Sequence, residues 1–272
     1  MQHPSNPPEP GLPEPSRNVQ VWPLVNASLK RCWAARDDLL RLGTIPLCLI
    51  FLVTLPVQGL MSGVMQASGQ GPEAITAAMA AATPRLVLLG LCSTAVLCLF
   101  AVNWLRLMTL GAAAAPGLGL GLGGRHFRFF LFMIVVAVTA TVATTLLTLL
   151  LQGFGGAGIL TAFTLGMILW LGTIVRLSPR WIGMAIDAPM PMAEAWRRTR
   201  GQGFKLALAV LLIEIPVLVA EQFIGVVFQA TGLVNVAPLA FLFIISAVEM
   251  LRFALQLGVF LAAYPQFVRE TV

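Results

Sequence analysis

The amino-acid sequence predicts an all-α polytopic membrane protein with six transmembrane helices in three hairpins and with the N and C termini cytoplasmic. The prediction rests on the composition, on the number of long apolar segments and on the placement of basic residues. Of the 272 residues, 58% are hydrophobic and only 10% are charged, and the mean hydropathy is +0.89. Soluble domains carry about 25% charged residues, so the composition excludes a soluble domain.

Six apolar segments are each long enough to cross a bilayer, whose hydrocarbon core is about 30 Å thick and needs roughly 20 helical residues. The predicted spans are 43–64, 86–109, 127–151, 157–176, 204–229 and 238–264. Together they make a predicted transmembrane domain over residues 43–268. The residues before the first span are polar and proline-rich, so we expect that span to be a signal anchor and not a cleaved signal peptide.

Basic residues fall on alternate sides of the predicted spans. Most of the 17 Lys and Arg residues precede the first span, follow the last one, or flank the second–third and fourth–fifth junctions. The exceptions are Arg85, which falls on the opposite side, and Arg252, which lies within a span. Cytoplasmic loops of membrane proteins are enriched in Lys and Arg, so both termini are expected in the cytoplasm. This topology explains the net charge of +6 without a nucleic-acid partner.

Two segments precede the first span. Residues 1–20 are predicted to be a disordered, proline-rich cytoplasmic tail, because they contain almost no residue that a core could bury. Residues 21–42 are predicted to be an interfacial amphipathic helix, in which Val25, Leu29 and Cys32 recur at helical spacing and Trp33 adjoins basic residues. A helix packed on the cytoplasmic ends of the spans explains the same pattern equally well.

The sequence contains no convincing catalytic or metal-binding motif. Gly119, Gly121 and Gly124 match the dinucleotide fingerprint, but an apolar helical segment precedes them where that fingerprint needs a strand. The two histidines, His3 and His126, lie far apart and outside any pattern of metal ligands. We therefore expect a protein that is not an enzyme and that binds neither a cofactor nor a metal ion.

Residues 187–208 form the most organised polar stretch. Met192 and Trp196 can face the membrane while basic side chains point outward. The candidate contacts to anionic lipid are Arg197, Arg198, Arg200 and Lys205. The same charges also serve as an orientation signal without binding any particular lipid, and we favour this simpler interpretation.

The stretch "RLSPRWIGMAIDAPMPMAEAWRRTRGQGFKL" resembles a segment of uncharacterised six-span bacterial membrane proteins. These proteins include the membrane domain that accompanies some glycerophosphoryl diester phosphodiesterases. Arg176 matches the arginine that ends their fourth span, and Ala195, Trp196, Thr199 and Gly201 match a short motif before the fifth. The resemblance implies a six-helix inner-membrane module of unknown biochemical role, without the catalytic domain of those enzymes.

Ionisable residues inside the fifth and sixth spans form the main candidate site. At 1.5 Å per residue, Glu214 and Glu249 both lie about 15 Å from the start of their spans, near the bilayer midplane. Arg252 follows Glu249 by one turn, and Gln256 extends the same stripe by another. Glu221 lies about 10 Å further out than Glu214, where water is expected.

The candidate intramembrane polar cluster is therefore Glu214, Glu249, Arg252 and Gln256. One arginine cannot neutralise two glutamates, so either one glutamate is protonated or water reaches the cluster. The structural interpretation, which we favour, is a buried pair that fixes the register of two helices. The functional interpretation is a midplane binding site of the kind found in transporters.

Two functions follow from these interpretations. The leading expectation is a non-enzymatic module of the bacterial cytoplasmic membrane that organises lipids or protein partners. The alternative is a small secondary transporter centred on Glu214, Glu249 and Arg252. Membrane lipids are the expected partners in both cases, with other membrane proteins as a second class.

Overall fold

The computed structural model describes residues 19–115 and 123–268, and within these ranges the regular structure is helical. This confirms the predicted all-α class. Nearly all of the predicted tail lies outside the described residues, as do Gly119 and Gly121 of the glycine-rich segment.

Brief connections join the long and the short helices. The long helices are α2 (Arg36–Ser68), α3 (Pro72–Leu110), α4 (Gly124–Leu151), α5 (Gly155–Arg176), α8 (Gly203–Ala230) and α10 (Pro238–Val268). The short helices are α1 (Val21–Ala34), α6 (Ser178–Ala185), α7 (Met192–Arg198) and α9 (Leu233–Val236). Two 3-10 turns, η1 (Ala112–Ala114) and η2 (Gln152–Phe154), follow α3 and α4.

The chain is a multi-pass membrane protein. Five helical segments in the described ranges are long and apolar enough to cross a membrane. A sixth is obtained when Leu160–Arg176 and Ser178–Ala185 are taken as one span with a 53° bend. The bend has a local cause, because Pro179 in the first turn of α6 cannot donate a backbone hydrogen bond and disfavours helical geometry at the preceding residue.

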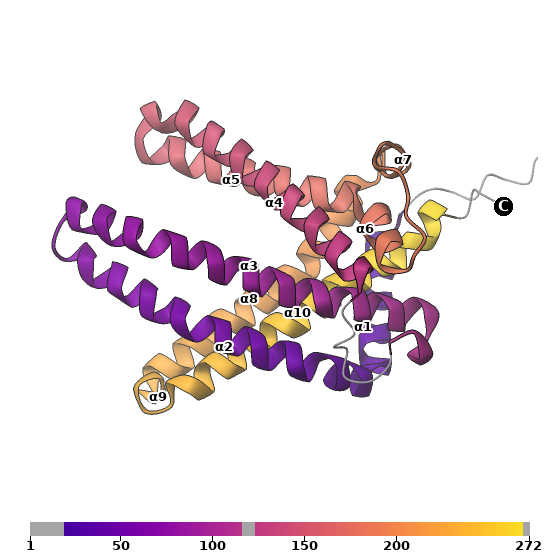
Figure 1. The fold of residues 1–272 in the computed structure, drawn as a ribbon, viewed down its shortest axis with the longest axis horizontal. Coiled ribbons are helices and arrows are strands. Elements are labelled where there is room, and N and C mark those ends of the chain that lie inside the picture. Colours follow the sequence, from indigo (N-terminus) through magenta and orange to yellow (C-terminus); the bar gives the residue numbers. More distant parts are fainter. Residues whose placement is uncertain (1–18, 116–122, 269–272) are drawn as a thin grey trace, which may run out of the picture.

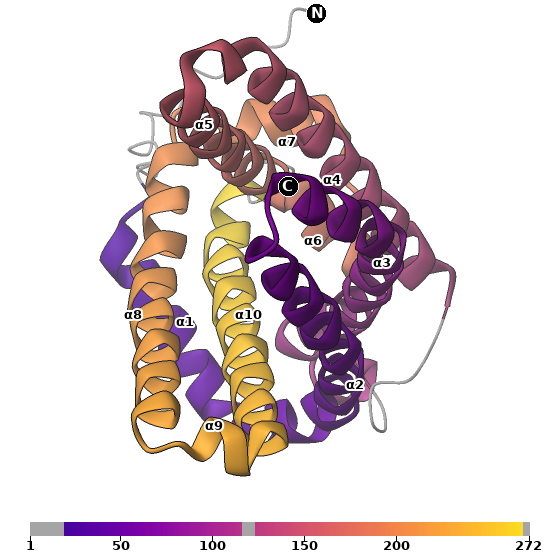
Figure 2. The ribbon, with the colours of Figure 1, turned by 90° about the vertical axis from the view of Figure 1, so that its left-hand side faces the viewer.

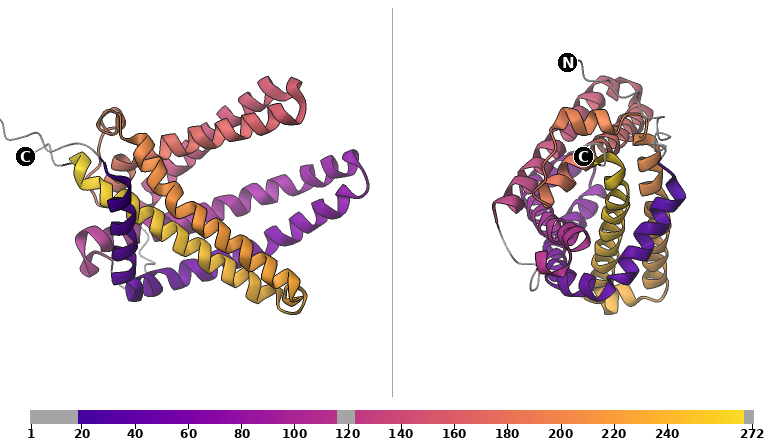
Figure 3. Two further views of the ribbon diagram at one scale, coloured as in Figure 1. Left: turned by 180° about the vertical axis from the view of Figure 1, so that it is seen from behind. Right: turned by 90° about the vertical axis from the view of Figure 1, so that its right-hand side faces the viewer.

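The long helices pair as α2 with α3, α4 with α5, and α8 with α10. Figure 1 shows the three pairs converging at one end of the molecule, where α1, α6 and α7 lie, and diverging towards the other end. The view along the pairs in Figure 2 and the reverse views in Figure 3 show the same separation. The three predicted hairpins are therefore present, and they contact one another mainly at the end that carries the short helices.

The buried core lies at this convergent end. Trp181 of α6 is at its centre, with ring centroids 6.2 Å from Phe129 and 5.2 Å from Phe260. Phe100 stacks on Trp104, one turn further along α3, at 5.9 Å. Towards the opposite end, large apolar side chains on the hairpins are exposed. In a membrane these surfaces face lipid, which is as apolar as the side chains themselves.

Helix α1 packs across α8 and α10. The Ser28 hydroxyl donates a hydrogen bond to the Leu255 carbonyl at 2.6 Å, and the Cys32 thiol donates to the Ala254 carbonyl at 3.6 Å. A Cβ atom at Gly258 would overlap the Ser28 hydroxyl, so only glycine permits this approach. The opposite side of α1 exposes Trp22 and Trp33. The helix therefore packs on the bundle and also presents tryptophans to its surroundings.

The amphipathic helix predicted over residues 21–42 ends earlier than expected. It stops at Ala34, and residues 36–42 are already part of α2. Asp37 and Asp38 lie in the first turn of α2, where carboxylates stabilise the positive end of the helix dipole. These two acidic residues mark the helix start that the apolar pattern alone did not indicate.

Candidate functional site

The candidate site lies between α8 and α10, which pack side by side (Figure 2). Both helices are strongly apolar, and α8 continues through Pro216 without a break. Pro216 has no N–H group, so the carbonyl one turn earlier loses its usual partner. The polar side chains of the site project from these two helices towards one another.

Arg252 on α10 is the centre of the site. Its Nη1 atom lies 3.4 Å from Glu214 Oε1 and 3.9 Å from Glu221 Oε2 on α8. Its Nη2 atom donates to Glu249 Oε1, one turn earlier on the same helix. The Gln256 amide donates to Glu214 Oε2. We call Glu214, Glu221, Glu249, Arg252 and Gln256 the carboxylate cluster.

The structure brings together the four residues predicted for the cluster and adds Glu221. The depth of Glu221 along its span predicts a position close to water, yet its side chain is only 16% exposed. The backbone positions of Glu214 and Glu221 lie about 10 Å apart along α8, but both side chains lean towards the same long arginine. The seven-residue spacing that puts the two glutamates on one face was the available signal.

Positive and negative charges do not balance in the cluster. Three carboxylates surround one guanidinium, which leaves a formal charge of −2 when all three are ionised. In addition, Glu221 Oε1 is buried and has no hydrogen-bond partner among the described residues. A buried carboxylate without compensation is strongly unfavourable, so the cluster has a physical reason to hold at least one proton.

Burial differs among the members of the cluster. The side chains of Arg252 and Glu214 are 19% and 23% exposed, whereas Glu249 is 46% exposed. Arg252 therefore interacts with Glu214 and Glu221 in a poorly solvated environment, and Glu249 lies at its edge. Removal of Glu249 should disturb the cluster least.

The cluster differs from a metal centre. In the two described ranges, no three His, Cys, Asp or Glu side chains are placed so as to hold a metal ion together. Three cavities lie elsewhere, between α3 and α4, between α4 and α5, and beside Asp187. None of these three cavities is lined by a residue of the cluster. The chemistry that the arrangement supports is proton exchange on carboxylates.

The four predicted lipid contacts separate into two groups. Arg198 is largely buried, because it pairs with Glu194 and donates to the Phe267 carbonyl. It therefore ties α7 to the end of α10. Arg197 and Arg200 are exposed, and Lys205 is half-buried. The exposed arginines are the members of the set that remain suited to a lipid head group.

The residues that carry the family resemblance hold α7 against the end of α5. The Arg176 guanidinium lies over the Trp196 ring, 4.4 Å from its centroid. The Thr199 hydroxyl is 3.1 Å from the Arg176 carbonyl, and Gly201 has a φ of +79° that favours glycine. Within this structure the motif makes packing contacts.

Sequence reasoning missed an ion-pair network at the convergent end. Asp187 Oδ2 lies 2.7 Å from Arg106 Nη1 of α3 and 3.0 Å from Arg125 Nη1 of α4. Asp187 also has a positive φ of 62°, a conformation that aspartate tolerates better than most residues. The network joins three segments that are far apart in sequence, and for this reason no local pattern indicated it.

The fold and the cluster together define a class of protein, namely a multi-pass helical membrane protein with ionisable side chains shared between two of its spans. Comparison of the chain with models of protein families, with curated proteins and with solved structures gives no match.

Proposed function

We propose that the chain is a small proton-linked secondary transporter of the bacterial cytoplasmic membrane, with the carboxylate cluster as its proton-binding site. The observation that supports this proposal most strongly is the excess of carboxylates around Arg252. Ionisable residues inside membrane spans are rare and commonly mark proton relays or substrate pathways.

A purely structural role explains the cluster less well. A buried pair that only fixes helix register needs one acid and one base, since uncompensated charge lowers stability. Here Glu221 adds a further acid whose Oε1 atom lacks a partner in the described part of the chain. Side chains that are retained at such a cost are typical of functional sites.

The arrangement suggests how a proton would act. When Glu221 or Glu214 takes up a proton, Arg252 loses one of its attractive partners and its remaining ion pairs strengthen. Because the acids are on α8 and the arginine on α10, protonation changes the attraction between two helices. Transport would couple this change to the exposure of the cluster on alternate sides of the membrane.

A flux assay tests the proposal. The purified protein is reconstituted into liposomes that contain a pH-sensitive dye, and a potassium diffusion potential drives proton entry. We expect faster acidification than in empty liposomes, and a reduction of at least about tenfold for Glu214→Gln and Glu221→Gln. Glu73→Gln is the matched control, because Glu73 is exposed in the first turn of α3. Equal rates for the wild-type protein and empty liposomes would contradict the proposal.

The second candidate function is a non-enzymatic module that organises lipids or protein partners. It is favoured by the exposed tryptophans Trp22 and Trp33 on α1 and by Arg197 and Arg200 beside the half-exposed Trp196. Tryptophan prefers the membrane interface, and basic side chains attract anionic lipids by about 1 kcal/mol each. The resemblance to six-span bacterial modules supports the same reading. It predicts no proton flux, and a loss of bound anionic lipid in Arg197→Gln/Arg200→Gln.

A further inference from the structure

A pocket of about 260 Å³ lies beside Asp187 at the convergent end, where the start of α4 meets α6. Arg128 of α4 and Met184 of α6 form two of its walls. Asp187 and Pro189, from the segment between α6 and α7, form the third. The pocket is smaller than the roughly 300–1,000 Å³ that is typical of sites for drug-sized ligands, so it suits a small chemical group.

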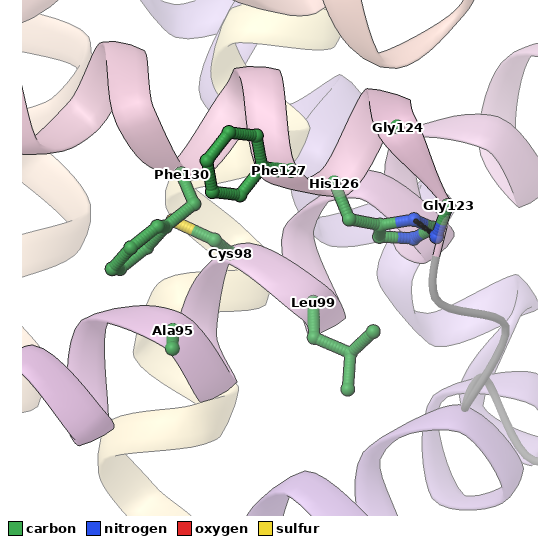
Figure 4. A pocket seen from close by; sticks show the side chains of 8 residues that line it. All are labelled: Ala95, Cys98, Leu99, Gly123, Gly124, His126, Phe127 and Phe130. Carbon is green, nitrogen blue, oxygen red and sulfur yellow. Dashed lines mark hydrogen bonds between the residues drawn. The ribbon is translucent and has the colours of Figure 1, made fainter.

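The charged side chains in its wall distinguish this pocket from the larger cavity between α3 and α4. That cavity has a volume of about 570 Å³, and Figure 4 shows Leu99, Phe127 and Phe130 among its lining residues. No arginine or lysine of the described chain lines it. A charged ligand is therefore expected beside Asp187 and not between α3 and α4.

The wall formed by the segment after α6 is held in place by its own contacts. The Ala188 N–H group donates to the Gly183 carbonyl at 2.8 Å, and Arg180 Nη1 donates to the Met190 carbonyl at 2.9 Å. A Cβ atom at Gly183 would overlap the Ala188 carbonyl oxygen, so glycine is required for this tight fold. The pocket is thus formed in advance, which lowers the entropic cost of binding a ligand.

Positive charge is in excess around the pocket. Arg106 and Arg125 share the single carboxylate of Asp187, at 2.7 and 3.0 Å. Arg180 donates to a backbone carbonyl, and Arg128 contacts one as well. Neither of these two pairs with a carboxylate of the described residues. Four guanidiniums and one carboxylate leave a formal charge of +3, and such a concentration of positive charge attracts anions.

Arg128 is the cation that can reach a ligand in the pocket. Its side chain is exposed and lines the pocket, and its Nε atom lies 3.3 Å from the Gly124 carbonyl oxygen. A guanidinium carries five N–H donors, so this contact leaves its Nη groups for a ligand. The carboxylate of Asp187 is compensated by Arg106 and Arg125, which reduces its repulsion of an incoming anion.

We propose that the pocket beside Asp187 binds a phosphate group through the guanidinium of Arg128. The formal charge of +3 favours a doubly charged phosphate over a singly charged carboxylate, and the planar fork of a guanidinium matches two phosphate oxygens. The phosphate can belong to a lipid head group or to a soluble phosphate, because both present the same chemistry.

The phosphate site goes beyond the proposed transport function. It lies between α4 and α6, whereas the carboxylate cluster lies between α8 and α10. Either proposal can therefore fail without the other.

The first test is thermal unfolding of the purified protein in a neutral detergent, titrated with inorganic phosphate or with potassium chloride at the same ionic strength. We expect phosphate to raise the unfolding temperature more than chloride does. Arg128→Gln should require about tenfold more phosphate for the same rise, because it removes a charge-assisted contact. Arg31→Gln is the matched control, because Arg31 is exposed on α1 and the change removes the same charge away from the pocket.

A short-chain lipid distinguishes the two sources of the phosphate. Dihexanoyl-phosphatidate that stabilises the protein at a lower concentration than inorganic phosphate does, and that loses this advantage in Arg128→Gln, identifies a lipid head group. Equal potency of the two probes, again reduced in Arg128→Gln, identifies a soluble phosphate. Both results support the site.

Two results of the titration would overturn the proposal: equal effects of phosphate and chloride, and an equal phosphate requirement of Arg128→Gln and the wild-type protein. A measurement on the unaltered chain covers the case in which Arg128→Gln does not fold. Phenylglyoxal modifies accessible arginines, and mass spectrometry locates them. Phosphate should slow the modification of Arg128 and leave that of Arg31 unchanged. Equal rates for Arg128 in phosphate and in chloride would also contradict the proposal.

Discussion

Arg252 on α10 lies 3.4 Å from Glu214 on α8, and the same nitrogen atom of Arg252 lies 3.9 Å from Glu221. The Arg252 guanidinium thus interacts with two acids on the neighbouring helix and with a third, Glu249, on its own helix. This imbalance predicts opposite effects of removing the base and removing an acid.

Arg252→Gln should lower the free energy of unfolding by about 3–5 kcal/mol, because it leaves buried carboxylates without a counter-charge. Glu221→Gln should leave the stability unchanged or raise it, because it removes excess negative charge. Thermal unfolding in detergent measures both effects, with Glu73→Gln as the control. If Glu214→Gln and Glu221→Gln each destabilise the protein as strongly as Arg252→Gln, the cluster is a balanced structural pair.

Asp187→Asn should destabilise the convergent end by about 2–4 kcal/mol. Asparagine tolerates the positive φ at this position, but it removes the charge that pairs with Arg106 and Arg125. The Arg106 side chain is only 14% exposed, so its unpaired charge is costly. The same change at the exposed Asp37, which lies 3.8 Å from Arg36 and in the first turn of α2, should cost less, about 0.3–1 kcal/mol. Equal unfolding midpoints of the two variants would show that the network contributes little.

Gly258→Ala should detach α1 from α10, since the new methyl group overlaps the Ser28 hydroxyl. The expected loss is about 1–3 kcal/mol, typical of overpacking in a filled core. Gly225→Ala on α8 introduces the same methyl group where no atom lies within 4 Å, and it should be neutral or slightly stabilising. Limited proteolysis within α1 reports the detachment. Cleavage at the same rate in both variants would exclude the close packing described for Ser28.

Burial raises the pKa of the Cys32 thiol from its ordinary value of 9.0 to about 11. The raised value means that the folded state keeps its proton when the unfolded state has lost it. This contribution to stability is complete below pH 9 and falls by about 2–3 kcal/mol as the pH rises to 11. In a variant that lacks the other three cysteines, the protein with Cys32 should lose this stability as the pH rises from 9 to 11. The corresponding Cys32→Ala protein should not lose it. Parallel stability curves of the two proteins between pH 9 and 11 would contradict it.

The helical spans were predictable from the sequence because the requirement behind them is local. A segment in lipid must satisfy its own backbone hydrogen bonds, so a long apolar run is enough to indicate a helix. The bend between α5 and α6 was not predicted, although Pro179 marks it. Hydropathy alone gives the length of a span and not its direction.

The cluster was predictable in part. Glu249, Arg252 and Gln256 follow one another on a single helix face. The depth of Glu214 in the membrane, counted along its own span, predicts that it lies at the same level as these residues. Contacts that depend on tertiary packing were not predicted. Arg106 pairs with Asp187, which lies 81 residues further along the sequence. Arg198 donates a hydrogen bond to the Phe267 carbonyl at the end of α10. Glu221 joins the cluster because the long side chains of Arg252 and Glu221 bridge the distance between their backbone positions.

The central claim is that the carboxylate cluster holds an exchangeable proton inside the membrane. Dicyclohexylcarbodiimide tests it directly, because this apolar reagent modifies protonated carboxyl groups within membranes, and mass spectrometry locates the modified residue. We predict modification of Glu214 or Glu221 that declines reversibly as the pH is raised, while the exposed Glu73 stays unmodified at alkaline pH. If neither Glu214 nor Glu221 is modified at any pH at which the protein stays folded, the cluster is a fixed set of ion pairs, and the proposed proton site is contradicted.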